Sequence, residues 1–179
     1  MTLDYAALER CLWPRGGDRD VWMIVDAARD RRIYGDLINS YLECSCLYSG
    51  RIPDELEANA PHLVQLIHDD RSTRELLQKA WGNSWGIFLR CPTTMQSLRR
   101  HLRGFLRVTD WTGKMLLFRY YDPRVLRVYL PTCTAQEAST VFGPITHFWA
   151  ETESGELEEF QFDRRAVRTS NHAIAPSNA

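Results

Sequence analysis

Two short apolar runs limit what this chain can fold into more than any other feature of the sequence. Val21–Asp26 (VWMIVD) and Trp85–Arg90 (WGIFLR) are each six residues long, and turn-forming residues flank both. Runs of this length are typical of strands that are buried on both faces of a sheet. The chain therefore needs amphipathic segments that cover such a sheet.

Helix signals alternate with these runs along the chain. Arg31–Leu42 places Ile33, Leu37 and Ile38 at helical spacing. Asp122 followed by Pro123 has the residue types of an N-cap and a first helical position. Capping-box spacing marks three further helix starts, at Ser72 with Glu75, Thr93 with Gln96, and Thr134 with Glu137. The expected helices cover residues 3–12, 31–42, 72–82, 93–106, 123–129 and 134–143.

The first apolar run, the helix over 31–42 and a second short strand over Cys44–Tyr48 predict a β-α-β unit with parallel neighbouring strands. A third strand is expected over His62–Ile67. Later segments predict hairpins, one around residues 111–114 and one that joins 145–150 to 157–162. The predicted fold class is α/β, with a mixed, partly parallel sheet covered by helices and C-terminal β-hairpin elements.

Composition favours one soluble domain over residues 1–162, followed by a flexible tail over 163–179 that has little apolar periodicity. The chain has 22 basic and 23 acidic side chains, so no net field attracts it to nucleic acid or to a membrane surface. Its five cysteines are an odd number, which predicts reduced thiols. The N-terminus lacks a signal-peptide pattern, and we expect a cytoplasmic protein.

Gly82-Asn83-Ser84-Trp85-Gly86 matches the G-x-S-x-G pattern of a hydrolase nucleophile elbow. Such an elbow needs a strand before the serine and a helix after it, whereas the order predicted here is reversed. Asp122 and His147 follow in the hydrolase order, so a serine hydrolase that uses Ser84 stays open as the least favoured alternative. The favoured interpretation is a helix-to-strand turn.

A metal site is the second candidate chemistry. Cys44 and Cys46 would lie on one strand face, with His62 and His68 downstream, but the spacing does not fit the common zinc patterns. Two small buried apolar side chains are the simpler interpretation. Phosphate-binding loops, dinucleotide fingerprints and zinc-protease helices are absent from the sequence, so we expect no enzymatic activity, no metal and no cofactor.

Arginines and aromatic residues mark a candidate partner-binding surface. A basic stripe of four arginines follows the outer face of the helix over 93–106 and could meet nucleic acid, an acidic membrane or an acidic protein surface, or could simply be solvated. Its members are Arg99, Arg100, Arg103 and Arg107, and a protein is the favoured partner because the chain as a whole is not basic. The second cluster is Phe118–Arg124 (FRYYDPR), in which strand alternation would turn Arg119 and Tyr121 away from the core. The predicted partner-binding residues are Arg119, Tyr121, Asp122, Arg124, Arg99, Arg100 and Arg103.

Four segments together resemble a known family. They are 25–30 (VDAARD), 81–90 (WGNSWGIFLR), 98–102 (LRRHL) and 118–126 (FRYYDPRVL). The resemblance is to the type VI secretion adaptors called Tap or TEC chaperones, long catalogued as a domain of unknown function, and it covers residues 11–162. It implies a non-enzymatic factor that binds a secreted toxic effector, through a PAAR-like, transthyretin-like or similar N-terminal region, and helps mount it on the VgrG spike. Many relatives carry a further C-terminal helical lobe after the segment that resembles this chain. Another protein-binding regulatory module remains the alternative to this adaptor.

Overall fold

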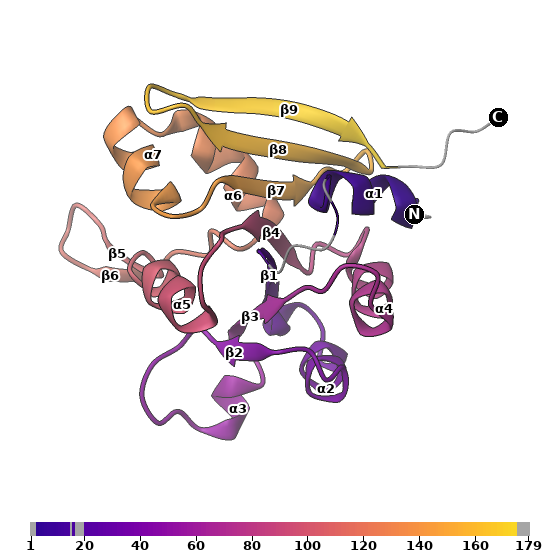
Figure 1. Cartoon of the computed structure of the whole chain (residues 1–179). Coiled ribbons are helices and arrows are strands. Elements are labelled where there is room, and N and C mark those ends of the chain that lie inside the picture. Colours follow the sequence, from indigo (N-terminus) through magenta and orange to yellow (C-terminus); the bar gives the residue numbers. More distant parts are fainter. Residues whose placement is uncertain (1–2, 15, 17–19, 175–179) are drawn as a thin grey trace.

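The computed structural model describes residues 3–14, 16 and 20–174. In this part of the chain, seven strands form one sheet in the order β2-β3-β1-β4-β7-β8-β9, and β5 and β6 form a separate hairpin (Figure 1). No helix of the described part is long and apolar enough to cross a membrane. The helices are α1 (Tyr5–Leu12), α2 (Arg32–Asn39), α3 (Asp54–Glu57), α4 (Arg71–Ala80), α5 (Met95–Arg103), α6 (Pro123–Tyr129) and α7 (Ala135–Phe142), with short 3-10 turns at Ala27–Arg29 and Leu130–Thr132. The strands are β1 (Val21–Asp26), β2 (Cys44–Cys46), β3 (Pro61–Gln65), β4 (Gly86–Arg90), β5 (Arg107–Thr109), β6 (Met115–Leu117), β7 (His147–Glu151), β8 (Glu156–Phe162) and β9 (Val167–Ala173).

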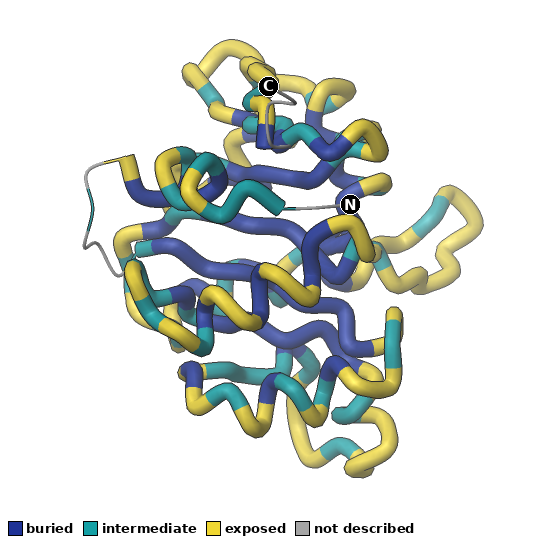
Figure 2. Tube along the Cα trace, turned by 90° about the vertical axis from the view of Figure 1, so that its right-hand side faces the viewer, coloured by how far each residue is buried: buried dark blue, intermediate teal, exposed yellow. Residues whose placement is uncertain are grey.

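Helices cover both faces of the large sheet. α1, α2 and α4 pack on one face, and α5, α6 and α7 pack on the other (Figure 1). Successive side chains of β1 point to opposite faces of the sheet. Val21 and Met23 pack in the apolar cluster under α1, α2 and α4, and Trp22 and Ile24 pack in the cluster under α5, α6 and α7. All six residues of β1 are buried, and the central strands form continuous dark blue runs in Figure 2. The predicted α/β class and the strand buried on both faces are confirmed.

The strand order corrects the predicted parallel pairing. β1 and β2 are not neighbours, because β3 lies between them and pairs antiparallel with both. β1 in turn lies between β3 and β4, and all neighbours in the described sheet are antiparallel. The elements β1-α2-β2-β3-α4-β4 therefore form a split β-α-β arrangement, in which each helical crossover skips one strand. β7, β8 and β9 extend this core on the β4 side.

Local capping explains where several helices begin. The Thr134–Glu137 capping box is present with both of its reciprocal hydrogen bonds, as predicted. Two other starts differ from the prediction by one or two residues. α4 is capped by Asp70, whose side chain accepts from the Thr73 N–H, and α5 is capped by Thr94.

The C-terminal region corrects the predicted tail. Residues 167–173 form β9, which pairs with β8 along its whole length, so an ordered edge strand stands where a flexible tail was expected. The sequence of β9, VRTSNHA, is mostly polar because most of its side chains are exposed at the sheet edge. It therefore lacks the alternation of apolar and polar residues that predicts a strand. The last five residues of the predicted tail lie outside the described residues.

Two glycines give a matched test of this packing. A Cβ at Gly86 would lie 1.8 Å from the Ile24 carbonyl oxygen, whereas a Cβ at Gly35 would meet nothing within 4 Å. Gly86→Ala should lower the free energy of unfolding by about 1–3 kcal/mol, because two central strands must move apart. Gly35→Ala, on the exposed side of α2, should raise it by about 0.5–1 kcal/mol. Urea denaturation followed by tryptophan fluorescence measures both, and equal stabilities would contradict the β1–β4 register.

Candidate partner-binding surface

An ion pair joins the end of β1 to the segment that precedes α6. The Asp26 carboxylate, with a side chain only 2% exposed, accepts hydrogen bonds from the Ala28 N–H at 3.2 Å and from the Arg119 guanidinium. Arg119 itself is 44% exposed. The hydrogen bond to Asp26 and the negative charge of the Asp26 carboxylate both raise the pKa of Arg119. Asp26 thus fixes the Arg119 guanidinium, while much of the Arg119 side chain remains exposed to solvent.

Asp122 caps α6, as the sequence predicts. Its carboxylate accepts from the Arg124 N–H at 3.0 Å and pairs with the Arg124 guanidinium at 2.6 Å, and Pro123 occupies the first turn. Burial alone raises the pKa of Asp122, but the hydrogen bonds and the charge of Arg124 outweigh it and bring the pKa below its usual value. The Arg124 side chain remains 52% exposed.

Tyr121 lies where the sequence argument did not place it. It was expected to face away from the core, but only 2% of it is exposed, and Tyr120 next to it is fully buried. Residues 119–122 form a turn in which the Asp122 N–H donates to the Arg119 carbonyl at 3.0 Å, so strand alternation does not apply to them. Burial strongly raises the pKa of Tyr121, and the neighbouring Tyr48 raises it further. The expectation that Tyr121 faces outward is therefore wrong.

The basic stripe on α5 divides into two roles. The Arg99 guanidinium donates to the backbone carbonyls of Cys46 at 2.6 Å and Tyr48 at 2.8 Å, and so ties α5 to the end of β2. Arg100 is exposed and Arg103 is half-buried. In the described part of the chain, no carboxylate oxygen lies within 4.0 Å of either guanidinium. Arg100 and Arg103 therefore keep their charges available to a partner.

The β5–β6 hairpin is the part of this surface that the sequence argument missed. The hairpin itself was predicted, but not that its apolar side chains would be exposed. Trp111 is 95% exposed, Met115 63% and Leu117 47%. Figure 1 shows the hairpin projecting from the fold beside α5. A signal was available, because Met115–Leu117 is apolar at three successive positions, so strand alternation places at least one of these side chains on the face away from the fold.

A groove runs between this hairpin and the segment that follows β2. Its volume is about 340 Å³. We call it the hairpin groove, and it is lined by Tyr48, Ser49, Ile52, Leu56, Arg107, Met115, Leu116 and Leu117. Apolar side chains thus form both walls of an open surface depression.

Ser84 lies in a helix-to-strand turn, between α4 and β4. Its backbone φ is 51°, and its N–H donates to the Glu151 carboxylate, which also accepts from the Gly82 N–H at 2.7 Å. Burial raises the pKa of Glu151, although these hydrogen bonds oppose the shift. Glu151 thus holds a left-handed turn.

His147, which follows Ser84 in the hydrolase order, lies at the start of β7 and pairs with Glu159 at 3.4 Å.

The residues considered as a metal site, which the sequence analysis did not favour, are only partly brought together. Cys46 lies opposite His62 in the sheet, but His68 contacts Glu9 instead. The described residues contain no group of three His, Cys, Asp or Glu side chains that could hold a metal. Burial raises the pKa values of the Cys44 and Cys46 thiols and lowers the pKa of His62.

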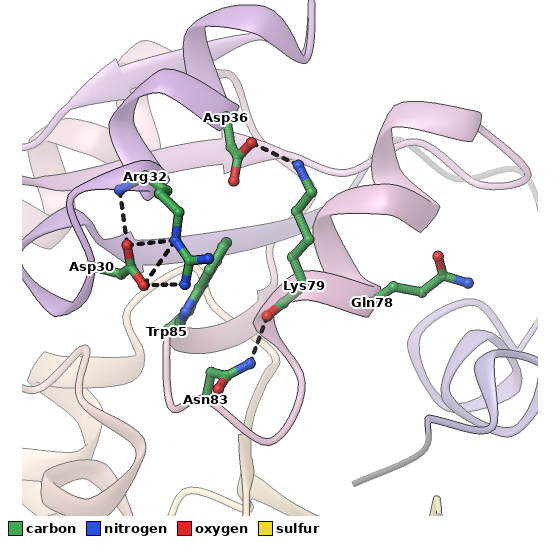
Figure 3. Close-up of a pocket in the computed structure, with 7 residues that line it drawn as sticks. All are labelled: Asp30, Arg32, Asp36, Gln78, Lys79, Asn83 and Trp85. Atoms are coloured by element: carbon green, nitrogen blue, oxygen red, sulfur yellow. Dashed lines mark hydrogen bonds and ion pairs between the residues drawn. The ribbon is translucent and has the colours of Figure 1, made fainter.

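A separate cleft lies between α2, α4 and the turn before β4 (Figure 3). Its charged side chains pair with one another, Asp30 with Arg32 and Asp36 with Lys79, both at 2.6 Å. Asn83 donates to the Lys79 carbonyl at 2.9 Å. With its charges already paired within the cleft, this surface is a weaker candidate for a charged partner than the arginines of α5.

Comparison with known proteins gives one match. A family model described as "Domain of unknown function (DUF4123)" matches residues 21–140, the greater part of the chain. This span contains the Asp26–Arg119 pair, the whole of α5 and the β5–β6 hairpin. No curated protein and no solved structure matches the chain.

The cap of α6 gives the second prediction. Asp122→Ala should lower the free energy of unfolding by about 0.5–2 kcal/mol at pH 7, whereas Asp122→Asn, which can still cap, should cost less. Because the folded pKa is lowered, the contribution of the charge is present above about pH 4 and disappears as the pH falls through the folded pKa. The wild-type advantage over Asp122→Asn should therefore shrink in acid. Chemical denaturation at pH 7 and pH 3 tests this, and a pH-independent difference would contradict the ion pair.

Proposed function

This chain belongs to the family described as domain of unknown function DUF4123, and from that premise we propose that it is a non-enzymatic adaptor for type VI secretion. In this proposal it binds a secreted toxic effector in the cytoplasm and helps load it onto the VgrG spike. The effector region that it holds is PAAR-like, transthyretin-like or similar. No cofactor, nucleic acid or membrane takes part.

The observation that carries the proposal is the exposed apolar hairpin beside unpaired arginines. Of the nine large apolar side chains that are exposed in the described residues, five belong to residues 107–117. Soluble proteins seldom leave such side chains clustered in water unless the cluster meets a partner. α5, which lies beside the hairpin, adds the positive charges of Arg100 and Arg103, and arginine is enriched in binding hot spots.

The segments that resemble the secretion adaptors also come together in space. Asp26, from the VDAARD segment, pairs with Arg119 of the FRYYDPR segment. The Asp26 N–H donates to the carbonyl of Trp85, from the WGNSWGIFLR segment, at 2.7 Å. Residues that are distant in the sequence thus form one structural unit, which supports transfer of the adaptor role to this chain.

The non-enzymatic part of the proposal is supported by the surroundings of Ser84. A nucleophile elbow presents its serine after a strand and before a helix, and Ser84 has the opposite context. The carboxylate beside it accepts backbone hydrogen bonds of the turn. These contacts are those of a structural turn.

The third prediction concerns the partner. The protein encoded beside this gene as its effector should co-purify with this chain. Arg124→Ala should weaken binding by about 1–3 kcal/mol, as the removal of a binding hot spot does. Arg100→Glu combined with Arg103→Glu should mainly slow association, because exposed charges steer encounter. Calorimetry measures the first effect, and stopped-flow at two salt concentrations measures the second.

The role of Arg119 in partner binding requires a double substitution, because replacing Arg119 alone leaves the Asp26 carboxylate buried and unpaired. Asp26→Asn with Arg119→Ala removes both charges and tests the contact without that defect. Arg71→Glu, at an exposed position on α4, serves as the charge control. If no neighbouring effector or VgrG binds the wild-type chain, the adaptor proposal is wrong.

A further inference from the structure

The hydrogen bonds at the two ends of the β5–β6 hairpin fix which backbone groups face outward. At the tip, the Asp110 N–H donates to the Lys114 carbonyl at 3.0 Å. At the base, the Phe118 N–H donates to the Leu106 carbonyl at 2.8 Å. In an antiparallel ladder, bonded and non-bonded residue pairs alternate. These two bonds therefore set the pattern for every pair between them.

The bonded pair in the middle is Val108 with Leu116, which are register partners. Met115 and Leu117 belong to non-bonded pairs, so their N–H and C=O groups point away from β5. No backbone hydrogen bond of the described residues engages these groups. β6 thus has a free edge that offers two donors and two acceptors to an added strand.

The hairpin groove adjoins this strand. Met115, Leu116 and Leu117 line it in succession, and Ile52 and Leu56 supply the facing wall. A surface that combines unpaired strand backbone with an apolar depression matches the known mode of peptide binding by strand addition. In that mode the backbone supplies affinity, and alternate side chains of the peptide enter pockets.

Charge around the groove favours an acidic segment. Arg107 lines the groove, Arg51 lies in the loop between Ser49 and Ile52, and Arg103 lies at the end of α5. Among the described residues, no carboxylate oxygen lies within 4.0 Å of these three guanidinium groups. α3, whose Leu56 lines the groove, also carries the exposed Asp54 and Glu55, and these charges bias the acidic end of a partner toward Arg107.

We propose that the free edge of β6 accepts an extended segment of the effector as a third strand, whose alternate apolar side chains fill the hairpin groove and whose flanking carboxylate pairs with Arg107. This inference rests on the proposed adaptor function. A two-stranded hairpin is marginally stable alone, and a third strand supplies the missing pairing and apolar cover. The effector segment in turn gains an ordered binding site before it is loaded.

Amide hydrogen exchange of the full chain, free and in complex with the full-length effector encoded beside it, tests the inference. In the free chain, Leu116 should exchange more slowly than Met115 and Leu117, because only its N–H is bonded within the hairpin. In the complex, the amides of Met115 and Leu117 should slow by at least about tenfold. A stable complex in which these two amides exchange as in the free chain would overturn the inference and leave the adaptor function intact.

Substitutions at Leu117 provide a second test of the proposed strand addition. Leu117→Pro removes a free-edge donor without removing a hairpin hydrogen bond, and Leu117→Glu places a charge in the groove. Each should weaken effector binding by at least about tenfold. Val128→Glu is the control, since Val128 is 72% exposed on α6 outside the groove. Equal affinities for both Leu117 variants, Val128→Glu and wild type would overturn the inference.

Two further results would contradict the proposed strand addition, namely dimerisation through β6 and the absence of effector binding. If light scattering shows that the chain alone dimerises and that Leu117→Glu makes it monomeric, a second copy occupies the edge and the inference is wrong. If no effector binds the wild-type chain, the adaptor function and this inference fall together. Monomeric wild type, a stable effector complex and protection at Met115 and Leu117 support it.

Discussion

The buried carboxylate of Asp26 constrains the arrangement of this surface more than any other single group. A charge with so little exposure needs a partner, because an unpaired buried carboxylate is strongly destabilising. Arg119 is that partner, which fixes the segment after the hairpin against the end of β1. Three residues later Asp122 caps α6, and two residues earlier β6 ends. The positions of the hairpin and of α6 both follow from this contact.

The rest of the fold makes that anchor rigid and leaves the hairpin open. β1 is covered on both faces and paired on both edges, so the end that carries Asp26 has little freedom. The hairpin, in contrast, exposes every residue of both its strands. At one edge of the large sheet, the Arg99 side chain donates to the Cys46 carbonyl of β2. β9 forms the other edge of that sheet, with mostly polar and exposed side chains. β6, in contrast, combines a free strand edge with an adjoining apolar groove, which is the arrangement expected of a surface that holds another chain.

Local features of this fold could be predicted from the sequence, and long-range features could not. The apolar run of β1, the Asp122 cap and the hairpin around Trp111 depend on neighbouring residues, so periodicity and turn chemistry identify them. The insertion of β3 between β1 and β2 depends on pairing between distant segments, which no local pattern encodes. β9 was missed because an edge strand with exposed polar side chains has no apolar alternation.

The candidate site follows the same division. The sequence identified Arg119 and Arg124 as a cluster because their residue types stand out locally. It could not show that Arg99 binds two backbone carbonyls, since those belong to a segment about fifty residues away in sequence. It also placed Tyr121 outside, because alternation was assumed where the chain turns. The exposed hairpin was overlooked because an apolar strand is normally interpreted as core.

Site-specific photo-crosslinking in the native cell tests the central claim most directly. A benzophenone amino acid would replace Trp111, which is 95% exposed on the hairpin, or Tyr41, which is 96% exposed after α2. The account predicts that Trp111 captures the effector and Tyr41 does not. Capture of the effector from Tyr41 alone, or from neither position, would contradict it.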